Sequence, residues 1–176
     1  GEKMSIITSK AQTTRHRIMG IVNDEEHQIV FSDTPGVIVP KYTLQESMMS
    51  FVQGSLVDAD IILFVTDINE KYDENDVIEK LLNTTAKVAV LINKIDKSSE
   101  AEVFAKIEYW KEKLNPEAIF AISALLDYNV SPIMDYIKER LPVHPPYYEK
   151  DELTDKSMRF FASEMIGEKI FNNLKL

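Results

Sequence analysis

The sequence contains no cysteine, only five glycines, and no apolar run near the ~18 to 20 residues that a membrane helix needs. Without cysteine there is no disulfide, no thiolate nucleophile and no thiolate metal site. Five glycines and seven prolines are too few for a collagenous or low-complexity chain. No basic region followed by an apolar stretch indicates secretion. We therefore expect a soluble, intracellular globular protein.

The charge balance limits the partners that this chain can bind. Twenty Lys and Arg stand against 29 Asp and Glu among 176 residues, which gives a formal net charge of -9. The chain as a whole therefore does not attract phosphate backbones or anionic lipid. A small anionic ligand can still be held locally by backbone amides and Mg²⁺.

Short apolar runs alternate with amphipathic segments along the chain. Two β-prone runs flank a polar turn and predict a hairpin, at residues 18–22 and 28–32. Three continuous apolar runs predict strands covered on both faces, at residues 61–66, 88–92 and 118–122. Capping signals and apolar spacing predict helices at residues 43–57, 73–82, 99–114, 130–141 and 154–174. This order predicts an α/β sandwich with a mostly parallel sheet and helices on both faces.

A proline-rich segment at residues 141–150 interrupts this pattern and indicates a domain boundary. We expect one α/β domain at residues 1–145, a linker at residues 146–153 and the start of a second domain at residues 154–176. The final helix is amphipathic and needs a further surface on which to pack.

A polar triplet, Asn93, Lys94 and Asp96, follows the predicted strand at residues 88–92. A carboxylate that accepts two N–H bonds matches the N1–H and exocyclic amine of guanine, and it repels the acceptor edge of adenine. An Asn amide can tie neighbouring loops together, and a Lys stem can lie flat over a purine. The alternative is a polar turn after a buried strand, because Asn and Asp are frequent turn residues.

Two weaker motifs also end predicted strands. Asp33 and Gly36 belong to residues 33–36 (Asp-Thr-Pro-Gly), where a carboxylate can hold a Mg²⁺ water and a glycine amide can approach a phosphate. Ser123 and Ala124 follow the last predicted strand. Taken singly, the first motif is explained by an ordinary turn and the second by packing. Together with the polar triplet, their order predicts a ligand site at the carboxyl ends of the strands.

The order of these motifs resembles that of the translation-factor-type P-loop GTPases, and at a level closer than the superfamily it resembles the Era family of bacterial ribosome-assembly GTPases. Three segments carry this resemblance: residues 10–17 (Lys-Ala-Gln-Thr-Thr-Arg-His-Arg), 33–36 and 155–161 (Asp-Lys-Ser-Met-Arg-Phe-Phe). The resemblance covers essentially the whole chain. It implies a GTPase-type three-layer sandwich, followed by the first helix of an RNA-binding α+β KH domain.

The resemblance also implies roles on the phosphate side of a nucleotide site. Thr14, with Thr13 as the fallback, would reach Mg²⁺ in the GTP state. Asp33 would hold Mg²⁺ through water, and the amide of Gly36 would meet the γ-phosphate. Val37 cannot orient an attacking water by hydrogen bonding, so no residue is assigned as a catalytic base.

On the base side, the residues that the resemblance implies for reading guanine are Asn93, Lys94 and Asp96. Ala124 would donate its backbone amide to the base carbonyl, and Ser123 would shape the loop. Leu125 stands where the family usually has a charged residue.

Two signatures of the family do not occur in these 176 residues. One is the Gly-x-x-x-x-Gly-Lys-[Ser/Thr] phosphate loop, which in the family precedes the stretch where this sequence begins, together with the first strand. The other is the Gly-x-x-Gly clamp of the KH domain. We therefore expect this sequence to be a piece of a longer protein.

The resemblance implies a cytoplasmic GTPase that hydrolyses GTP to GDP with Mg²⁺ as a switch in small ribosomal subunit assembly. It further implies binding of 16S rRNA through the KH domain, and it allows peripheral association with the inner membrane. Two alternatives stay open. One is a nucleotide-independent interaction module or inactive GTPase fragment, which the missing phosphate loop favours. The other is a phosphatase with Asp33 as nucleophile, which lacks the second carboxylate where Pro35 stands.

Overall fold

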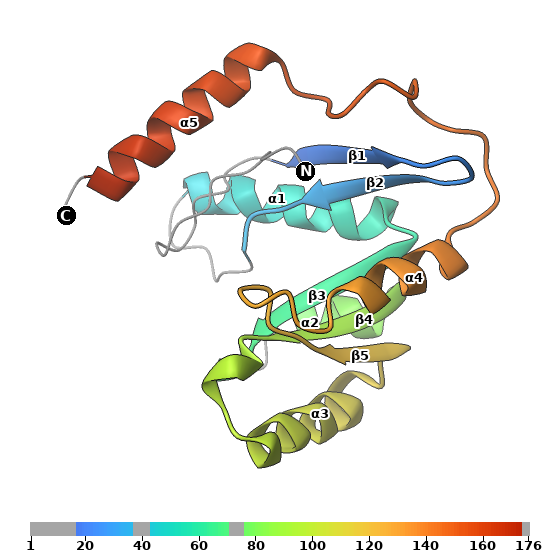
Figure 1. Ribbon diagram of the computed structural model, residues 1–176, viewed down its shortest axis with the longest axis vertical. Coiled ribbons are helices and arrows are strands. Elements are labelled where there is room, and N and C mark those ends of the chain that lie inside the picture. Colours follow the sequence, from blue (N-terminus) through green and yellow to red (C-terminus); the bar gives the residue numbers. More distant parts are fainter. Residues whose placement is uncertain (1–16, 37–42, 71–75, 174–176) are drawn as a thin grey trace. The chain divides into compact units, whose positions relative to one another are not determined.

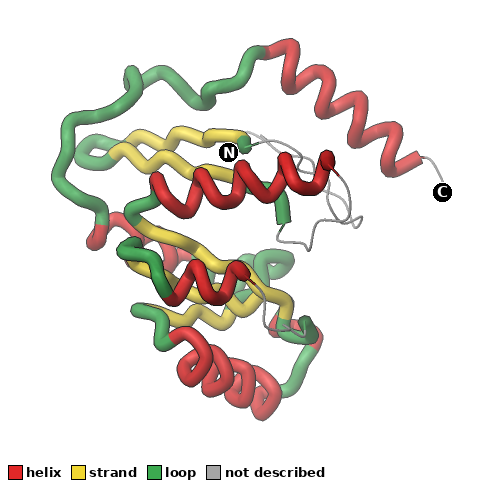
Figure 2. Tube along the Cα trace, turned by 180° about the vertical axis from the view of Figure 1, so that it is seen from behind, coloured by secondary structure: helices red, strands yellow, loops and turns green. Residues whose placement is uncertain are grey.

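The computed structural model describes residues 17–36, 43–70 and 76–173 (Figures 1 and 2). The elements are β1 (Ile18–Asn23), β2 (Gln28–Asp33), α1 (Thr43–Asp58), β3 (Ile61–Asp67), α2 (Asp76–Leu82), β4 (Lys87–Asn93), the 3₁₀ helix η1 (Ile95–Lys97), α3 (Glu100–Leu114), β5 (Ala118–Ala121), α4 (Ser131–Arg140) and α5 (Met158–Asn173). They form two compact units, one of Gly1–Val57 with His144–Leu176 and one of Asp58–Val143. No helix within the described ranges is long and apolar enough to cross a membrane.

The second unit is built on a parallel sheet with the strand order β3-β4-β5. The central strand β4 is buried from Ala89 to Ile92 without alternation, as expected for a strand covered on both faces. The register pairs Asp67, the last residue of β3, with Asn93, the last residue of β4. Two polar residues therefore lie side by side at the carboxyl edge of this sheet.

Helices cover both faces of the parallel sheet. Phe64 of β3 meets Trp110 of α3 edge-on, with ring centroids 5.3 Å apart, and Phe120 of β5 meets Tyr136 of α4 at 5.5 Å. The β4 neighbours of these two phenylalanines are successive residues, so the two rings point to opposite faces. Helix α4 lies in front of the sheet in Figure 1 and behind it in Figure 2, with α2 on the other side. The predicted α/β sandwich is confirmed in this unit.

Local signals set the ends of the helices in the second unit. Ser99 caps α3 in a reciprocal capping box with Glu102, as predicted: its Oγ accepts the Glu102 amide, and the Glu102 carboxylate accepts the Ser99 amide at 2.7 Å. Pro132 stands in the first turn of α4, where its missing N–H costs no helical bond. Helix α4 stops at Arg140, because Leu141 precedes a proline and is extended.

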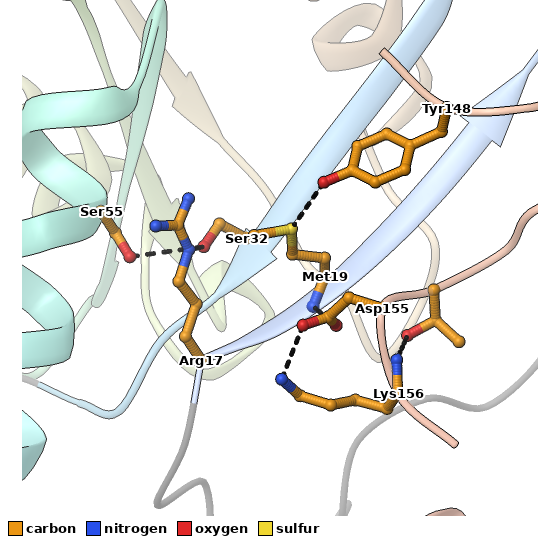
Figure 3. Close-up of polar contacts among 8 residues, drawn as sticks. Arg17, Met19, Ser32, Ser55, Tyr148, Asp155 and Lys156 are labelled. Atoms are coloured by element: carbon orange, nitrogen blue, oxygen red, sulfur yellow. Dashed lines mark hydrogen bonds and ion pairs between the residues drawn. The ribbon is translucent and has the colours of Figure 1, made fainter. Parts of the chain in front are cut away.

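The first unit contains the predicted antiparallel hairpin of β1 and β2. On α1, Met48, Met49 and Val52 form a buried apolar cluster. Ser32 of β2 lies 3.4 Å from Ser55 of α1 between their hydroxyl oxygens, and it also accepts a hydrogen bond from Arg17 Nε at 2.7 Å (Figure 3). Polar contacts therefore connect α1 with the hairpin.

Residues 147–155, which overlap the linker predicted at residues 146–153, are hydrogen-bonded to the hairpin, and we call them the strap. The amide of Ile21 in β1 donates to the carbonyl of Leu153 at 2.8 Å. The side-chain amide of Asn23 donates to the carbonyl of Lys150 at 3.1 Å. Tyr148 donates from its hydroxyl to the sulfur of Met19 at 3.4 Å (Figure 3). Hydrogen bonds to the hairpin do not fix where a domain ends, so the predicted domain boundaries at residues 145 and 154 stay predictions.

The strap leads into α5 through the Asp-Lys-Ser motif. Asp155 accepts the amide of Met19 at 3.1 Å and forms an ion pair with Lys156 at 2.6 Å (Figure 3). Burial alone would raise the pKa of Asp155, but these two bonds outweigh it and leave the pKa below its ordinary value. The hydroxyl of Ser157 accepts the Phe160 amide at 3.3 Å in the first turn of α5. The motif thus fixes the start of α5 against β1.

Candidate functional site

The loop after β4 carries the predicted guanine-reading triplet. Asn93 ends the strand, Lys94 takes a left-handed conformation with φ of 63°, and Asp96 lies in η1. The side-chain oxygen of Asn93 accepts the amide of Lys94 at 2.8 Å and that of Ala124 at 3.0 Å. The predicted role of this Asn in tying two neighbouring loops together agrees with these contacts.

Asp96 and Ser123 are also brought together by the two loops. The hydroxyl of Ser123 donates to Oδ1 of Asp96 at 2.6 Å, across 27 positions of sequence. Ser123 is 1% exposed, whereas Asp96 is exposed. A buried hydroxyl thus fixes the rotation of a solvent-facing carboxylate, and hydrogen bonds to ionised groups are the stronger ones. The carboxylate is held in one orientation, as a bidentate acceptor requires.

The backbone amide of Ala124 has an acceptor within the protein. Its amide was expected to serve the base carbonyl, but in this structure it donates to the side chain of Asn93. It can reach a ligand only by sharing this hydrogen or after Asn93 turns, because a backbone amide has a single N–H. The neighbouring Leu125 is 81% exposed, at the position where a charged residue was expected from the family.

A residue that the sequence reasoning missed lies beside the triplet. Asp67 ends β3, and its Oδ2 lies 2.6 Å from Nζ of Lys94. The bond from Lys94 holds the pKa of Asp67 below its ordinary value, and the same bond raises the pKa of Lys94. The signal that could have found it is its position, since it ends the strand next to the one that Asn93 ends.

Residues predicted for the phosphate side belong to the first unit or lie outside the described residues. Asp33 is the exposed last residue of β2, and Pro35 after it is fully buried. A Cβ added at Gly36 would meet nothing within 4 Å, so no described contact demands a glycine there. Thr14, with its fallback Thr13, and Val37 lie outside the described residues.

The donor set for a magnesium ion is small in the described part of the chain. No group of three or more His, Asp or Glu that could hold a metal occurs among the residues described. A single carboxylate such as Asp33 still fits the usual coordination of Mg²⁺, which keeps several waters and binds one or two protein carboxylates together with substrate phosphates. The magnesium roles of Asp33 and Thr14 stay predictions.

Residues 1–94 match the family described as 50S ribosome-binding GTPase. The chain belongs to this GTPase family. It is 38% identical over 177 aligned positions to GTPase Era of Clostridium botulinum strain Eklund 17B, and 37% identical to that of strain Alaska E43. These alignments cover 99% of the chain and 60% of each relative, so the chain spans about three fifths of the length of these relatives.

Solved structures of the family have the same fold. Era in complex with MgGDPNP and nucleotides 1506–1542 of 16S ribosomal RNA is 36% identical, with a TM-score of 0.89. An Aquifex aeolicus Era variant bound to GDP·AlF₄⁻ gives the same identity and the same TM-score. Both comparisons cover 100% of this chain and 61% of the other. The resemblance to the Era family and the P-loop GTPase fold are therefore confirmed, whereas the roles of single residues stay predictions.

Proposed function

We propose that this protein binds GDP and GTP with Mg²⁺ and hydrolyses GTP as a switch in assembly of the small ribosomal subunit. The observation that carries the proposal is the carboxylate of Asp96, held by the buried hydroxyl of Ser123 at the carboxyl edge of the parallel sheet. Ligands of open α/β sheets bind at this edge. Similarity to Era structures that contain MgGDPNP or GDP·AlF₄⁻ supports the choice of ligand.

The geometry favours guanine over adenine. A fixed carboxylate at Asp96 accepts the N1–H and the exocyclic amine of guanine, whereas adenine presents an acceptor at the equivalent ring position. Among the described residues, no acceptor pairs with the Nδ2 hydrogens of Asn93, whose oxygen is engaged by two amides. These hydrogens can donate to the acceptor atoms of a purine. Asp96 therefore selects the base, and Asn93 supports its loop.

The phosphate side of the proposal rests on the first unit. We assign Asp33 and Thr14 to Mg²⁺, and Gly36 to the γ-phosphate. Bound Mg²⁺ would neutralise part of the phosphate charge. The exposed carboxylate of Asp33 at the end of β2 supports its assignment.

The division into domains belongs to the same proposal. Residues 1–145 would form the nucleotide-binding domain, residues 146–153 a linker and residues 154–176 the start of a KH domain that binds 16S rRNA. The Era complex with a 16S rRNA segment supports this partner. A cytoplasmic location is proposed with it, and no described residue supports the predicted association with the inner membrane.

A calorimetric titration of the chain with GDP and Mg²⁺, with ADP as the control, tests the proposal. We expect GDP to bind and ADP to bind at least about 100-fold more weakly, because two charge-assisted hydrogen bonds are replaced by an unfavourable contact. Equal binding of the two nucleotides would overturn the assignment of Asp96. Absence of binding by either would favour the nucleotide-independent interaction module for this chain.

A further inference from the structure

The ion pair between Asp67 and Lys94 lies at the edge of the sheet where the nucleotide is proposed to bind. These residues end or follow the adjacent parallel strands β3 and β4, and Nζ of Lys94 is 2.6 Å from Oδ2 of Asp67. The side chain of Asp67 is 27% exposed and that of Lys94 is 51% exposed. The contact is therefore partly shielded on the acidic side and open on the side of the Lys stem.

The carboxylate of Asp67 is itself fixed by the turn that follows β3. Its Oδ1 accepts the amide of Asn69 at 2.9 Å, which leaves Oδ2 for Lys94. Its own amide donates to the side chain of Glu70 at 3.3 Å, and Lys106 of α3 donates to the carbonyl of Glu70. The turn is thus tied down at both ends, so the position of Oδ2 is defined before any ligand arrives.

The backbone at Lys94 is also held in an unusual conformation. A φ of 63° is uncommon for a lysine and is less favourable than the right-handed region. Two backbone bonds hold this conformation: Ile68 donates to the carbonyl of Asn93 at 3.0 Å, and Lys97 donates to that of Lys94 at 3.0 Å. Strained backbone that the surrounding structure fixes is found at ligand sites more than elsewhere.

We propose that Asp67 is a positioning residue for the guanine nucleotide, which fixes the ammonium of Lys94 so that its alkyl stem forms a fixed apolar support for the purine. This inference rests on the proposed function. A free Lys side chain has considerable rotamer entropy, part of which is lost when a ligand immobilises it. Because Asp67 restricts the Lys before binding, less is lost on binding.

An ordinary surface ion pair offers a matched comparison within the same unit. Glu108 and Lys111 of α3 also approach to 2.6 Å, but their side chains are 43% and 57% exposed, and they are neighbours on one helix. Such exposed pairs contribute little to stability. Removing the carboxylate of Glu108 should leave nucleotide binding unchanged, whereas removing that of Asp67 should not.

The test compares GDP and ADP binding by calorimetry in the unsubstituted chain and in Asp67→Asn, with Glu108→Gln as the control. We expect Asp67→Asn to weaken GDP binding about fivefold to tenfold, the size of one immobilised side chain, with guanine still preferred over adenine. Glu108→Gln should bind as the unsubstituted chain does. If Asp67→Asn does not fold, Asp67→Ser serves instead, because a serine hydroxyl can still accept the Asn69 amide.

A double-mutant cycle shows whether Asp67 acts through Lys94. Lys94→Met keeps an unbranched apolar stem and removes the charge, so adding Asp67→Asn to it should weaken binding no further. An undiminished loss in the double variant, or GDP binding by Asp67→Asn equal to that of the unsubstituted chain, would overturn the inference alone. If the unsubstituted chain does not prefer GDP over ADP, the proposed function fails first and the inference fails with it.

Discussion

Two side-chain amides, Asn93 and Gln28, connect distant segments in the two units, and they do so in different ways. Asn93 accepts the amides of Lys94 and Ala124 through one oxygen. Gln28 accepts the amides of Tyr147 and Tyr148 at 2.7 and 3.0 Å through one oxygen. As acceptors, the two residues therefore act alike, because in each case one side-chain oxygen holds two backbone amides.

The donor side separates them. The Nε2 of Gln28 donates to the side chain of Asn23 at 2.8 Å and to the carbonyl of Tyr148 at 2.9 Å, so both its hydrogens are engaged. In the described part of the chain, the Nδ2 hydrogens of Asn93 meet no acceptor. An amide with all of its groups paired inside the protein stabilises structure, whereas one with donors remaining can serve a ligand. By this comparison, Gln28 has a structural role in holding the strap, whereas Asn93 has donors left for a ligand at the proposed guanine site.

The largest expected effect comes from a substitution at the proposed guanine site. Asp96→Asn replaces a double acceptor by an amide that also carries donors, so the two bonds to guanine are lost or opposed. We expect GDP affinity to fall at least about 100-fold, since each bond to a charged group is worth about 1.5–3 kcal/mol. Calorimetry measures it, with Asp127→Asn in the neighbouring loop as the control. A loss below tenfold, or an equal loss in the control, would contradict the role of Asp96.

The structural role of Gln28 is tested by Gln28→Ala, which removes all four hydrogen bonds of this side chain. Unpaired main-chain groups of Tyr147 and Tyr148 then return to water, and we expect the strap to detach at a cost of about 2 kcal/mol in the free energy of unfolding. Hydrogen exchange at these two amides should become much faster. Gln53→Ala, at an exposed position of α1, should change stability by less than about 0.5 kcal/mol. Unchanged exchange in Gln28→Ala would show that the strap does not depend on this side chain.

A smaller effect is expected from the buried hydroxyl that orients Asp96. Ser123→Ala removes the 2.6 Å bond to the carboxylate, so Asp96 must be ordered by the ligand instead. We expect GDP to bind about tenfold more weakly in calorimetry, the equivalent of one bond to a charged group. Ser98→Ala is the matched control, because that hydroxyl donates to the carbonyl of Ile95 within the same loop. Equal effects of the two substitutions would mean that loop stability, not orientation of Asp96, is measured.

The smallest expected effect is a dependence on pH in the strap. Because the folded pKa of Asp155 lies below its ordinary value of about 4, the carboxylate stabilises the fold above that value, and the contribution disappears as the pH falls through the folded pKa. Asp155→Asn lacks this contribution at every pH. Its melting temperature should lie about 1–3 °C below that of the unsubstituted chain near neutral pH, and the gap should close in acid. A gap that persists in acid would assign the effect to packing.

Features that depend on neighbouring residues were predictable from the sequence. The continuous apolar run of β4 predicted burial on both faces, and Ser99 with Glu102 predicted the capping box of α3. These predictions hold because hydrophobic period and capping chemistry act over a few residues.

The strap and Asp67 were missed for a physical reason. The strap is bonded to the hairpin largely through main-chain groups across about 120 positions, and such groups are present in every residue, so they leave no pattern in the sequence. Asp67 looks like any polar residue at the end of a strand until the register places it beside Asn93. The bond from the Ala124 amide to Asn93 was not predicted either, because it depends on the relative positions of two loops.

Amide chemical shifts in the ¹⁵N-labelled chain during titration with GDP, and separately with ADP, test the guanine site most directly. With Mg²⁺ present, GDP should shift the amides of Lys94, Asp96 and Ala124 more than any others of the second unit, and ADP should leave them in place. Shifts of equal size with ADP, or amides of this loop that do not respond to GDP, would contradict a guanine site built on Asp96.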